Sequence, residues 1–511
     1  MADTASPRSE PPVGGARDAA LARFLTAASG AQACEITGLA PLAGGAIQEN
    51  WGLDARFMGG TLDGAQHLVL RAAGETGVPS SLNRLQEYTV LRAAFDAGVT
   101  VPEPLIACAD PSVFGKPFFV MRRAAGTAAA HRITRDPSLE SVLSDIAERL
   151  GRELARIHTI RPPRPDLAFL PPYAESGPSR QIAGFRAYLD AHPNPRPVLE
   201  WGIRWLETHC PPPVEPVLCH HDFRTGNYLL DGARLTGILD WEFAGWGDPH
   251  EDIGWFCSKG WRFARLDREA GGIADRAPFY RGYESASGRL IDPVRVFFWE
   301  VLASVRWAVI ALQQSDRHIL AGERSLDLAL TGRRATECEL AILILLDPGG
   351  EPKVHLAEAR STSLAKASAE ATRDLPPGPA LLALARNVLI NDLLPLLPVE
   401  HQLEARLIAN CMAIAEREAR QAAFGAEQIE RELGSFYPSV LTRRPPAQIS
   451  RADEAEVVDQ SLLRHFAHEL RIGGFENSPE REAEVRTILW HWTIAKLRLS
   501  NPRFLAANGL S

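Results

Sequence analysis

The sequence lacks the features that mark several common protein classes. Its seven cysteines are an odd number and form no Cys-x-x-Cys pair, which argues against a disulfide framework and a structural zinc site. No run of Lys and Arg is present, and 55 basic against 63 acidic residues give a net charge of -8, so no nucleic-acid partner is expected. The most apolar stretch, residues 296–312, contains Glu300 and Arg306 and is shorter than the ~20 residues that span a bilayer.

Charged residues also interrupt the first 20 positions, so the sequence shows no secretory signal there. We therefore expect a cytoplasmic protein without a membrane partner. What the sequence does contain is an ordinary globular balance, with 45% hydrophobic and 23% charged residues over 511 positions. At roughly 100 to 200 residues per domain, this length predicts roughly two to four domains.

Short apolar runs separated by turns dominate the first quarter of the chain. The predicted strands are 39–42, 51–57, 67–71 and 117–121. Apolar residues at helical spacing predict a helix over 82–97. This part is therefore predicted to be a small sheet that carries one helix.

Helical patterns take over in the middle of the chain. Residues 139–160 repeat apolar side chains every four positions, and helices return at 293–346. Between them, residues 216–239 predict a short hairpin inserted among the helices. Residues 347–379 are rich in Pro, Gly, Ser and Ala and predict a boundary, after which 380–511 is helical in pattern.

The densest group of reactive side chains lies on a polar loop and at the end of the predicted hairpin. Asp222 precedes Asn227 by five positions on the loop, and the hairpin returns Asp240 to it. Phosphoryl transfer uses this inventory: a carboxylate that accepts a hydroxyl proton, an amide and a second carboxylate that hold Mg²⁺, and a cation near the phosphate. Arg224 is the candidate cation, because it follows Asp222 by two positions.

Two motifs around these residues carry a family resemblance. They read His220-His-Asp-Phe-Arg-Thr-Gly-Asn227 and Asp240-Trp-Glu-Phe-Ala-Gly-Trp-Gly-Asp-Pro-His-Glu-Asp252. Together they resemble the aminoglycoside phosphotransferase and choline kinase superfamily, with the nearest likeness to the kinase-like domains associated with acyl-CoA dehydrogenases. The likeness extends over roughly residues 31–345. The C-terminal part resembles a small uncharacterised bacterial helical domain.

The resemblance implies an α+β, protein-kinase-like bilobal fold with a separate all-α C-terminal domain. The implied domains are a flexible tail at 1–30, a kinase-like N-lobe at 31–124, a helical C-lobe with the catalytic loop at 125–346, a linker at 347–376 and a helical C-terminal domain at 377–511. Three roles stay open for the last domain: packing against the kinase lobes, forming a homodimer, or holding a bulky substrate.

The resemblance also implies a role for each motif residue. Asp222 would be the catalytic base and Arg224 a phosphate contact, with Asn227 and Asp240 as Mg²⁺ ligands. The residues implied to hold ATP are Gly44, Gly45, Arg71, Glu87 and Met121. Within that set, the glutamate would orient the arginine, and the methionine belongs to the strand that contacts adenine.

Other polar residues near the motifs are interpreted as structural. His220 is expected to support the catalytic loop, Asp248 and Asp252 to cap a helix and brace that loop, and His158 to lie in the core. Two other positions depart from the family pattern. Arg71 stands where many kinases have Lys, which replaces a point charge with a planar fork, and His221 stands where the family has Gly, at the mouth of the loop.

The sequence thus predicts an ATP- and Mg²⁺-dependent phosphotransferase that acts on a hydroxyl of a small molecule, with a hydroxyacyl-CoA as the first candidate. An aminoglycoside or another amino alcohol is the alternative acceptor, and a non-catalytic nucleotide-binding module is the alternative of a different class. A helical His-Asp phosphohydrolase fits poorly, because loop and strand signals surround Asp222. A Walker motif is excluded, because Pro117 follows Gly115-Lys116.

Overall fold

A computed structural model describes most of the chain. The described residues are 15–42, 49–74, 81–263, 265–323, 325–350, 378–438 and 451–510, so the predicted phosphate-contacting Gly44 and Gly45 lie outside them. The chain divides into two compact units. The first comprises Met1–Gly177, Pro213–Cys257 and Trp261–Val296, and the second comprises Pro178–Pro212, Ser258–Gly260 and Phe297–Ser511.

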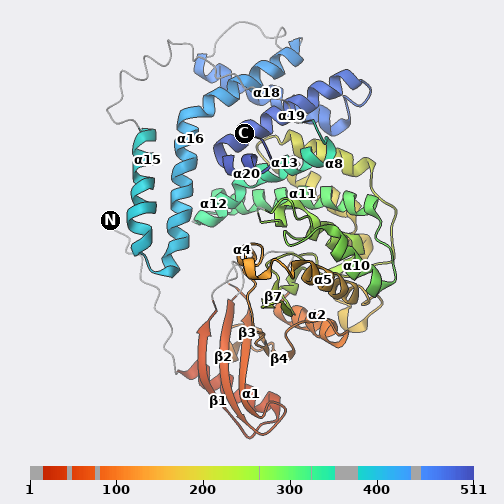
Figure 1. Ribbon diagram of the computed structural model, residues 1–511, viewed down its shortest axis with the longest axis vertical. Coiled ribbons are helices and arrows are strands. Elements are labelled where there is room, and N and C mark those ends of the chain that lie inside the picture. Colours follow the sequence, from red (N-terminus) through yellow and green to blue (C-terminus); the bar gives the residue numbers. More distant parts are fainter. Residues whose placement is uncertain are drawn as a thin grey trace. The chain divides into compact units, whose positions relative to one another are not determined.

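The first unit begins with a five-stranded antiparallel sheet in the order β1-β2-β3-β5-β4 (Figure 1). Its strands are β1 Ala33–Pro41, β2 Glu49–Met58, β3 Gly64–Ala72, β4 Pro104–Cys108 and β5 Phe118–Arg122. Each run that the sequence predicts as a strand overlaps one of these, and only β4, which is five residues long, was not predicted. The second half of β3, from Leu68 to Ala72, is buried throughout, which places this central strand in the core.

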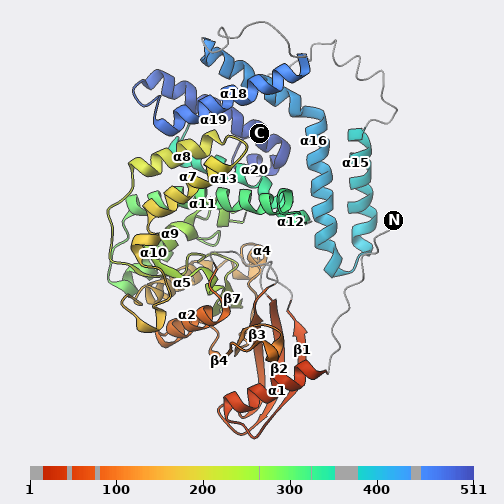
Figure 2. The same ribbon diagram turned by 180° about the vertical axis from the view of Figure 1, so that it is seen from behind.

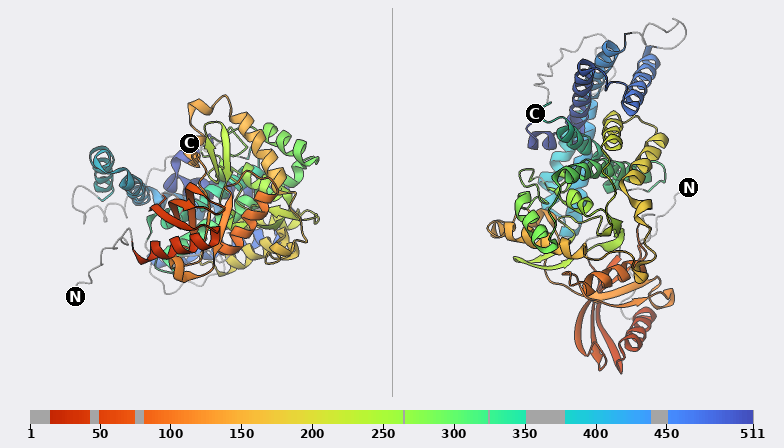
Figure 3. Two further views of the ribbon diagram at one scale, coloured as in Figure 1. Left: turned by 90° about the horizontal axis from the view of Figure 1, so that it is seen from below. Right: turned by 90° about the vertical axis from the view of Figure 1, so that its right-hand side faces the viewer.

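Helix α1 (Ala16–Ser29) packs on this sheet, although the sequence predicts a flexible tail for residues 1–30. Leu21 and Leu25 are fully buried among sheet residues, and the ring of Phe24 meets that of Phe118 edge-on at 5.7 Å. Figure 3 shows the helix beside the strands. The three apolar residues lie at i, i+3 and i+4, which forms the stripe that a sheet can cover.

Helix α2 (Arg84–Asp96) follows the sheet strands and matches the helix predicted at 82–97. Its start is fixed by a capping box, in which the Asn83 side chain accepts from the backbone of Leu85 and Gln86 while the Gln86 side chain accepts from the Asn83 backbone. This cap sets the phase of the first turn and thereby turns Glu87 inward, where it is buried.

The helical part of the first unit surrounds the predicted hairpin. Its main elements are α5 Leu143–Ile157, β6 Val217–Cys219, β7 Tyr228–Asp231, β8 Arg234–Ile238, β9 Gly245–Gly247, α9 Pro249–Cys257 and α10 Arg276–Ser287. Strands β7 and β8 form the hairpin, and β6 pairs with β9. Short elements complete this part: α3 Pro111–Phe114, α4 Ala130–Ile133, α6 Tyr173–Ser176, and 3-10 turns at Pro137–Leu139, Pro165–Leu167, Trp241–Phe243 and Lys259–Trp261.

The second unit is helical (Figure 2). Its helices are α7 Pro178–Ala191, α8 Pro197–Thr208, α11 Pro293–Ile319, which starts in the first unit, α12 Leu326–Arg333, α13 Ala335–Leu346, α15 Gly378–Val388, α16 Val399–Phe436, α18 Arg451–Ile472, α19 Pro479–Ser500 and α20 Pro502–Ala507. Short π and 3-10 turns at Leu389–Leu393 and Leu394–Leu396 connect α15 to α16.

One hydrophobic core runs through the second unit. It joins side chains of α8 and α13, such as Ile203 and Ile342, to side chains of the C-terminal helices, such as Phe466, Leu489 and Trp490. The core therefore crosses the boundary that the sequence predicts between a C-lobe and a separate C-terminal domain.

Within the described part of the chain, two helical segments have the length and composition of a membrane span. Of the most apolar 18 residues of Pro293–Ile319, 72% are buried inside the protein, which identifies α11 as a core helix of the fold. The other segment, Gly378–Leu396, has a mean hydropathy of 1.2 over its window and no buried residue.

Candidate active site

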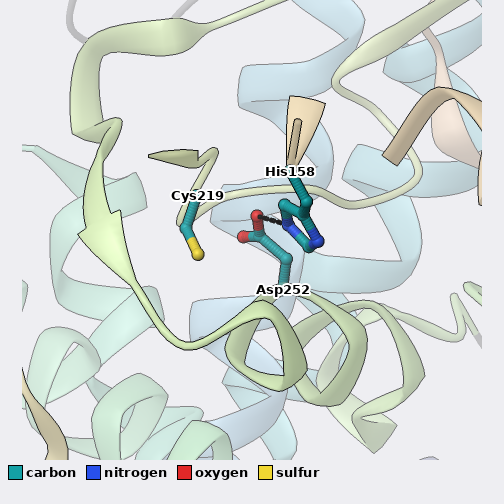
Figure 4. A group of neighbouring side chains, drawn as sticks. All are labelled: His158, Cys219 and Asp252. Carbon is teal, nitrogen blue, oxygen red and sulfur yellow. Dashed lines mark hydrogen bonds and ion pairs between the residues drawn. The ribbon is translucent and has the colours of Figure 1, made fainter. Parts of the chain in front are cut away.

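The polar loop that the sequence singles out connects β6 to β7, and Asp252 on α9 braces it. The Asp252 carboxylate accepts the backbone N–H of His220 and that of His221, each at 2.7 Å. It also lies 3.3 Å from Nε2 of His158, a buried residue that follows α5 (Figure 4). The predicted structural roles of His158 and Asp252 agree with these contacts.

His158, Cys219 and Asp252 also form the group of potential metal ligands found among the described residues, with ligand atoms within 4.8 Å of one another. All three side chains are buried. Both carboxylate oxygens of Asp252 already accept backbone hydrogen bonds, and burial raises the pKa of the Cys219 thiol, which disfavours the thiolate that a metal needs. We therefore interpret this cluster as part of the core rather than as a metal centre.

Asp222 lies at the centre of the loop, and three donors hold its carboxylate. Oδ1 accepts from the indole Nε1 of Trp255 at 2.9 Å, and Oδ2 accepts from the amide of Asn227 at 2.6 Å. Nε of Arg224 lies 3.1 and 3.2 Å from the two oxygens. The side chain predicted as the catalytic base is thus buried, ionisable and fixed in direction.

Arg224 contacts Asp222 rather than standing free for a phosphate. Its guanidinium stacks over the ring of Trp261, 4.6 Å from the ring centroid, and the rings of Trp261 and Trp255 lie 5.2 Å apart. Stacking and the carboxylate contact keep the cation within reach of any group that approaches Asp222.

Asn227 and Asp240 lie side by side, because the backbone N–H of Leu239 donates to the carbonyl of Asn227 at 2.8 Å. Asn227 donates to the carbonyl and the carboxylate of Asp222, so its amide oxygen is the atom that it can offer to a cation. Asp240 has a left-handed backbone, with φ of 69°, and its side chain is 30% exposed. An amide oxygen and a carboxylate are ligands that Mg²⁺ accepts, so these residues fit the ion.

Arg71 on β3 connects the sheet to this loop. Its Nε lies 2.9 Å from the Glu87 carboxylate, and its other end lies 2.5 Å from the Asp240 carboxylate. Burial alone would lower the pKa of Arg71, but the charges of Glu87 and Asp240 outweigh burial and raise it. Burial alone would raise the pKa of Asp240, but the charge of Arg71 lowers it. Both groups are therefore charged at neutral pH.

A second buried arginine, Arg84, was not predicted. It pairs with Glu87 one turn along α2 and lies 3.5 Å from Glu242, and it donates to the carbonyl of Leu82 at 3.1 Å. Burial and the charge of Asp240 raise the pKa of Glu242 to about 7. The i, i+3 spacing of an arginine and a glutamate was the sequence signal that could have identified this pair.

The two histidines before Asp222 are both turned inward. His220 is buried, and its Nε2 lies 2.9 Å from the carbonyl of Leu239, which matches the predicted structural role. His221 was expected to occupy the mouth of the loop, but its ring lies inside the fold, with Nδ1 3.0 Å from the carbonyl of Phe243. The backbone at His221 is left-handed, and the ring lies against Gly245 and Gly247 of β9.

The structure therefore brings together Arg71, Glu87, Asp222, Arg224, Asn227 and Asp240. Met121 is placed apart from their ion pairs, on β5 opposite Val69 of β3, where it is partly buried against the core. Trp255 was not predicted as a site residue, because no feature of the sequence distinguishes its indole N–H as a donor to Asp222.

Comparison with protein families places this site in a known context. A family described as "Phosphotransferase enzyme family" matches residues 39–288, which include all of the site residues above. We call residues 39–288 the phosphotransferase domain after this match. A second family, "Domain of unknown function (DUF6285)", matches residues 395–504, in the helical part of the second unit.

Several characterised sequences resemble the phosphotransferase domain. Acyl-CoA dehydrogenase family member 10 of Mus musculus is 30% identical over 199 residues, which cover 38% of this chain and 18% of the relative. Acyl-CoA dehydrogenase family member 11 of Gallus gallus is 34% identical over 208 residues, which cover 37% of this chain and 25% of the relative. The chain therefore spans a quarter or less of the length of these two relatives.

A solved structure supports the fold of the phosphotransferase domain. A crystal structure from Ralstonia eutropha, provisionally described as an aminoglycoside phosphotransferase, superposes with a TM-score of 0.51 at 23% identity, over 63% of this chain and 96% of that one. The order of a sheet followed by a helical body is the predicted α+β, protein-kinase-like fold. The phosphotransferase domain thus shares the fold of that structure, a sheet followed by a helical body.

Proposed function

We propose that the protein transfers the γ-phosphoryl group of ATP to a hydroxyl of a small molecule with the help of Mg²⁺. The arrangement around Asp222 supports this most strongly. Trp255 and Asn227 hold its buried carboxylate by hydrogen bonds. The Asp240 carboxylate, which is suited to bind a metal ion, and the side chains of Arg71 and Arg224 lie in the same site. A phosphotransferase has little covalent chemistry to perform, so such an arrangement of fixed charges supplies what the reaction requires.

Each residue of the site has a distinct task in this proposal. Asp222 orients the acceptor hydroxyl and takes its proton as the oxygen attacks phosphorus. Arg224 exchanges its contact with Asp222 for one with the transferred phosphate, which frees a lone pair of the carboxylate for the hydroxyl. Arg71, oriented by Glu87, contacts the phosphates of the bound nucleotide. Met121 and its strand neighbours contact the adenine mainly through backbone groups.

The same residues are suited to a bound Mg²⁺. Asn227 through its amide oxygen and Asp240 through its carboxylate would hold the ion, which would offset negative charge on the phosphates. In the structure described, Asp240 is paired with Arg71, so nucleotide binding is expected to transfer Arg71 from Asp240 to the phosphates.

For the acceptor, we propose a hydroxyacyl-CoA. The named relatives of the phosphotransferase domain are acyl-CoA dehydrogenase family members. In addition, the acidic residues near the loop that could receive the ammonium groups of an aminoglycoside are engaged internally. Asp248 pairs with His250 and Arg295, Asp252 braces the loop, and Glu242 lies beside Arg84.

The decisive experiment measures ADP release by the purified full chain with Mg-ATP. The acceptors are 4-hydroxyacyl-CoA thioesters, aminoglycosides, choline and homoserine, with mass spectrometry of the products. We expect a phosphorylated thioester, and we expect Asp222→Asn to lower turnover by about 10³-fold or more, because the amide cannot accept the proton.

Two results would contradict parts of this proposal. Phosphorylation of an amine-bearing acceptor alone would replace the substrate class and keep the chemistry. Nucleotide binding without any product would instead favour the non-catalytic nucleotide-binding module. The Asp222→Asn variant serves as a control for contaminating ATPase, since a residual signal that it shares with the wild type does not come from this site.

A homodimer and a cytoplasmic location complete the proposal. The seven cysteines are free thiols, as expected in a reducing compartment. Helix α15 exposes Leu381, Leu384 and Val388, and an apolar surface of this kind is common at subunit interfaces. Light scattering of the purified protein tests the dimer directly, and a monomer at high micromolar concentration would exclude it.

A further inference from the structure

His221 combines three unusual features. Its backbone is left-handed, with φ of 59°, a conformation that is unfavourable for a residue other than glycine. Its ring is nearly enclosed, with 11% of the side chain exposed. It directly precedes Asp222, the residue that we assign as the base. A strained and buried histidine at this position calls for a compensating interaction.

The ring makes that interaction with the segment that follows Asp240. Nδ1 of His221 lies 3.0 Å from the carbonyl oxygen of Phe243, so the ring N–H donates from the loop between β6 and β7 to the turn Trp241–Phe243. Nε2 lies 3.5 Å from the buried carboxylate of Glu251 on α9. The backbone N–H of His221 is held by Asp252 at 2.7 Å.

Two glycines of β9 provide the space for this ring. A Cβ atom at Gly245 would lie 3.3 Å from Cε1 and 3.5 Å from Nδ1 of His221, and no other described residue beyond its chain neighbours comes within 4 Å of it. A Cβ atom at Gly247 would lie 2.7 Å from Nε2. A histidine on one loop and small residues on the opposing strand therefore match each other sterically.

We propose that His221 is a positioning residue that sets the spacing between the base Asp222 and the metal ligand Asp240. The ring N–H joins the residue before Asp222 to the short helical turn Trp241–Phe243, which starts directly after Asp240. A change in this contact would shift the two carboxylates relative to each other without altering either of them. This inference rests on the proposed kinase function, because it assigns base and metal-ligand roles to the two aspartates.

Two substitutions test the contact without adding backbone strain at this position. His221→Gly removes the ring, and glycine adopts this positive φ without steric strain. His221→Asn tolerates a left-handed backbone and places an amide N–H near the position of the ring Nδ1. We expect His221→Gly to lower kcat and the affinity for the divalent ion by about 10-fold, as is typical when an outer-sphere contact is lost, and His221→Asn to recover most of both.

The readout includes a measurement other than activity. Binding of Mn²⁺ to the protein with saturating ADP, followed by electron paramagnetic resonance, reports the ion site even if the acceptor is not yet known. Thermal unfolding of each variant separates loss of position from loss of fold. The KM for ATP at saturating Mg²⁺ should change little, because Arg71 and Glu87 do not contact His221.

A compensating variant makes the test sharper. Gly245→Ala should disturb the wild type, because its methyl group meets the ring, and it should have no further effect in the His221→Gly background. Equal Mn²⁺ affinity and equal kcat in wild type and His221→Gly would overturn the inference, as would additive effects of the two substitutions. If the wild type binds Mn²⁺ and ADP but phosphorylates no acceptor, the proposed function fails while the Mn²⁺ series still decides the role of His221.

Discussion

The carboxylate of Asp222 shows how single residues prepare the site. Its direction is set in part by the indole N–H of Trp255, a residue that the sequence does not single out. Asp222, Asn227 and Asp240 were predictable because their spacing along the chain reflects a local loop and hairpin. Trp255 and Arg84 were not, because their roles depend on which way a helix turns once it is packed.

Trp255→Phe tests the indole contact. The phenyl ring keeps most of the buried surface, but Asp222 loses a hydrogen bond to a charged acceptor, worth about 1.5–3 kcal/mol. We expect kcat to fall by about 10-fold or more with little change in the KM for ATP, measured by ADP release with the accepted substrate. In the Asp222→Asn background the same substitution should cause no further loss of kcat. A proportional loss in both backgrounds would show that Trp255 acts only through the fold.

His158 provides a prediction about pH. Burial lowers its pKa below the usual 6.5 in spite of the hydrogen bond to Asp252. As the pH falls through 6.5, the unfolded chain therefore binds a proton that the folded protein does not, and stability decreases. The pKa of Asp252 is also lowered: burial alone would raise it, but the hydrogen bond from His158 outweighs burial. Stability that depends on this carboxylate is lost only at still lower pH, below its usual 3.8.

Urea unfolding at pH 8, 6.5 and 5.5 measures this effect. The wild type should lose stability across this range, at about 1.4 kcal/mol for each pH unit over which only the unfolded chain is protonated at His158. His158→Gln keeps a donor for Asp252 without a titrating group, so its stability should depend less steeply on pH. Equal slopes for the two proteins would refute this account.

Among the helices and strands, α5 and α10 cross at close range. A Cβ atom at Gly151 would lie 2.1 Å from the carbonyl oxygen of Phe279, and one at Gly282 would lie 1.9 Å from that of Glu148. The helical pattern of residues 139–160 was predictable from apolar spacing. The crossing was not, because a glycine within a helix indicates a close approach only after its partner is known.

Gly151→Ala should therefore destabilise the protein by about 2 kcal/mol or more, since backbone atoms cannot move aside as a flexible side chain can. Gly184→Ala on α7 is the matched control. Beyond the backbone of its own helix and its chain neighbours, no atom of the described residues lies within 4 Å of the added Cβ. Alanine is also favoured over glycine in a helix, so the substitution should stabilise by about 0.5–1 kcal/mol. Thermal unfolding of the two variants should shift in opposite directions, and a shared direction would contradict the packing argument.

Considered as a whole molecule, the chain differs from its predicted organisation in the C-terminal half. The Pro- and Gly-rich segment predicted a linker between independent domains, and its central residues lie outside those that the structure describes. Amphipathic patterns revealed the flanking helices but carry no information on which apolar faces meet. In the second unit, buried Glu339 of α13 contacts Arg196 next to α8 and Lys496 of α19, so charged contacts accompany the shared core.

Removal of residues 351–511 tests this organisation. The truncation uncovers apolar side chains of α8 and α13 that are buried in the second unit, such as Leu199 and Ile342. A newly exposed apolar surface promotes association between molecules, so the shortened chain should aggregate or unfold at a lower temperature than the full chain. Within the full chain, Leu489→Ala should destabilise by about 2–5 kcal/mol, because it opens a cavity in the same core. A truncated protein that is monomeric, as heat-stable as the full chain and equally active would show that the phosphotransferase domain does not need the C-terminal helices.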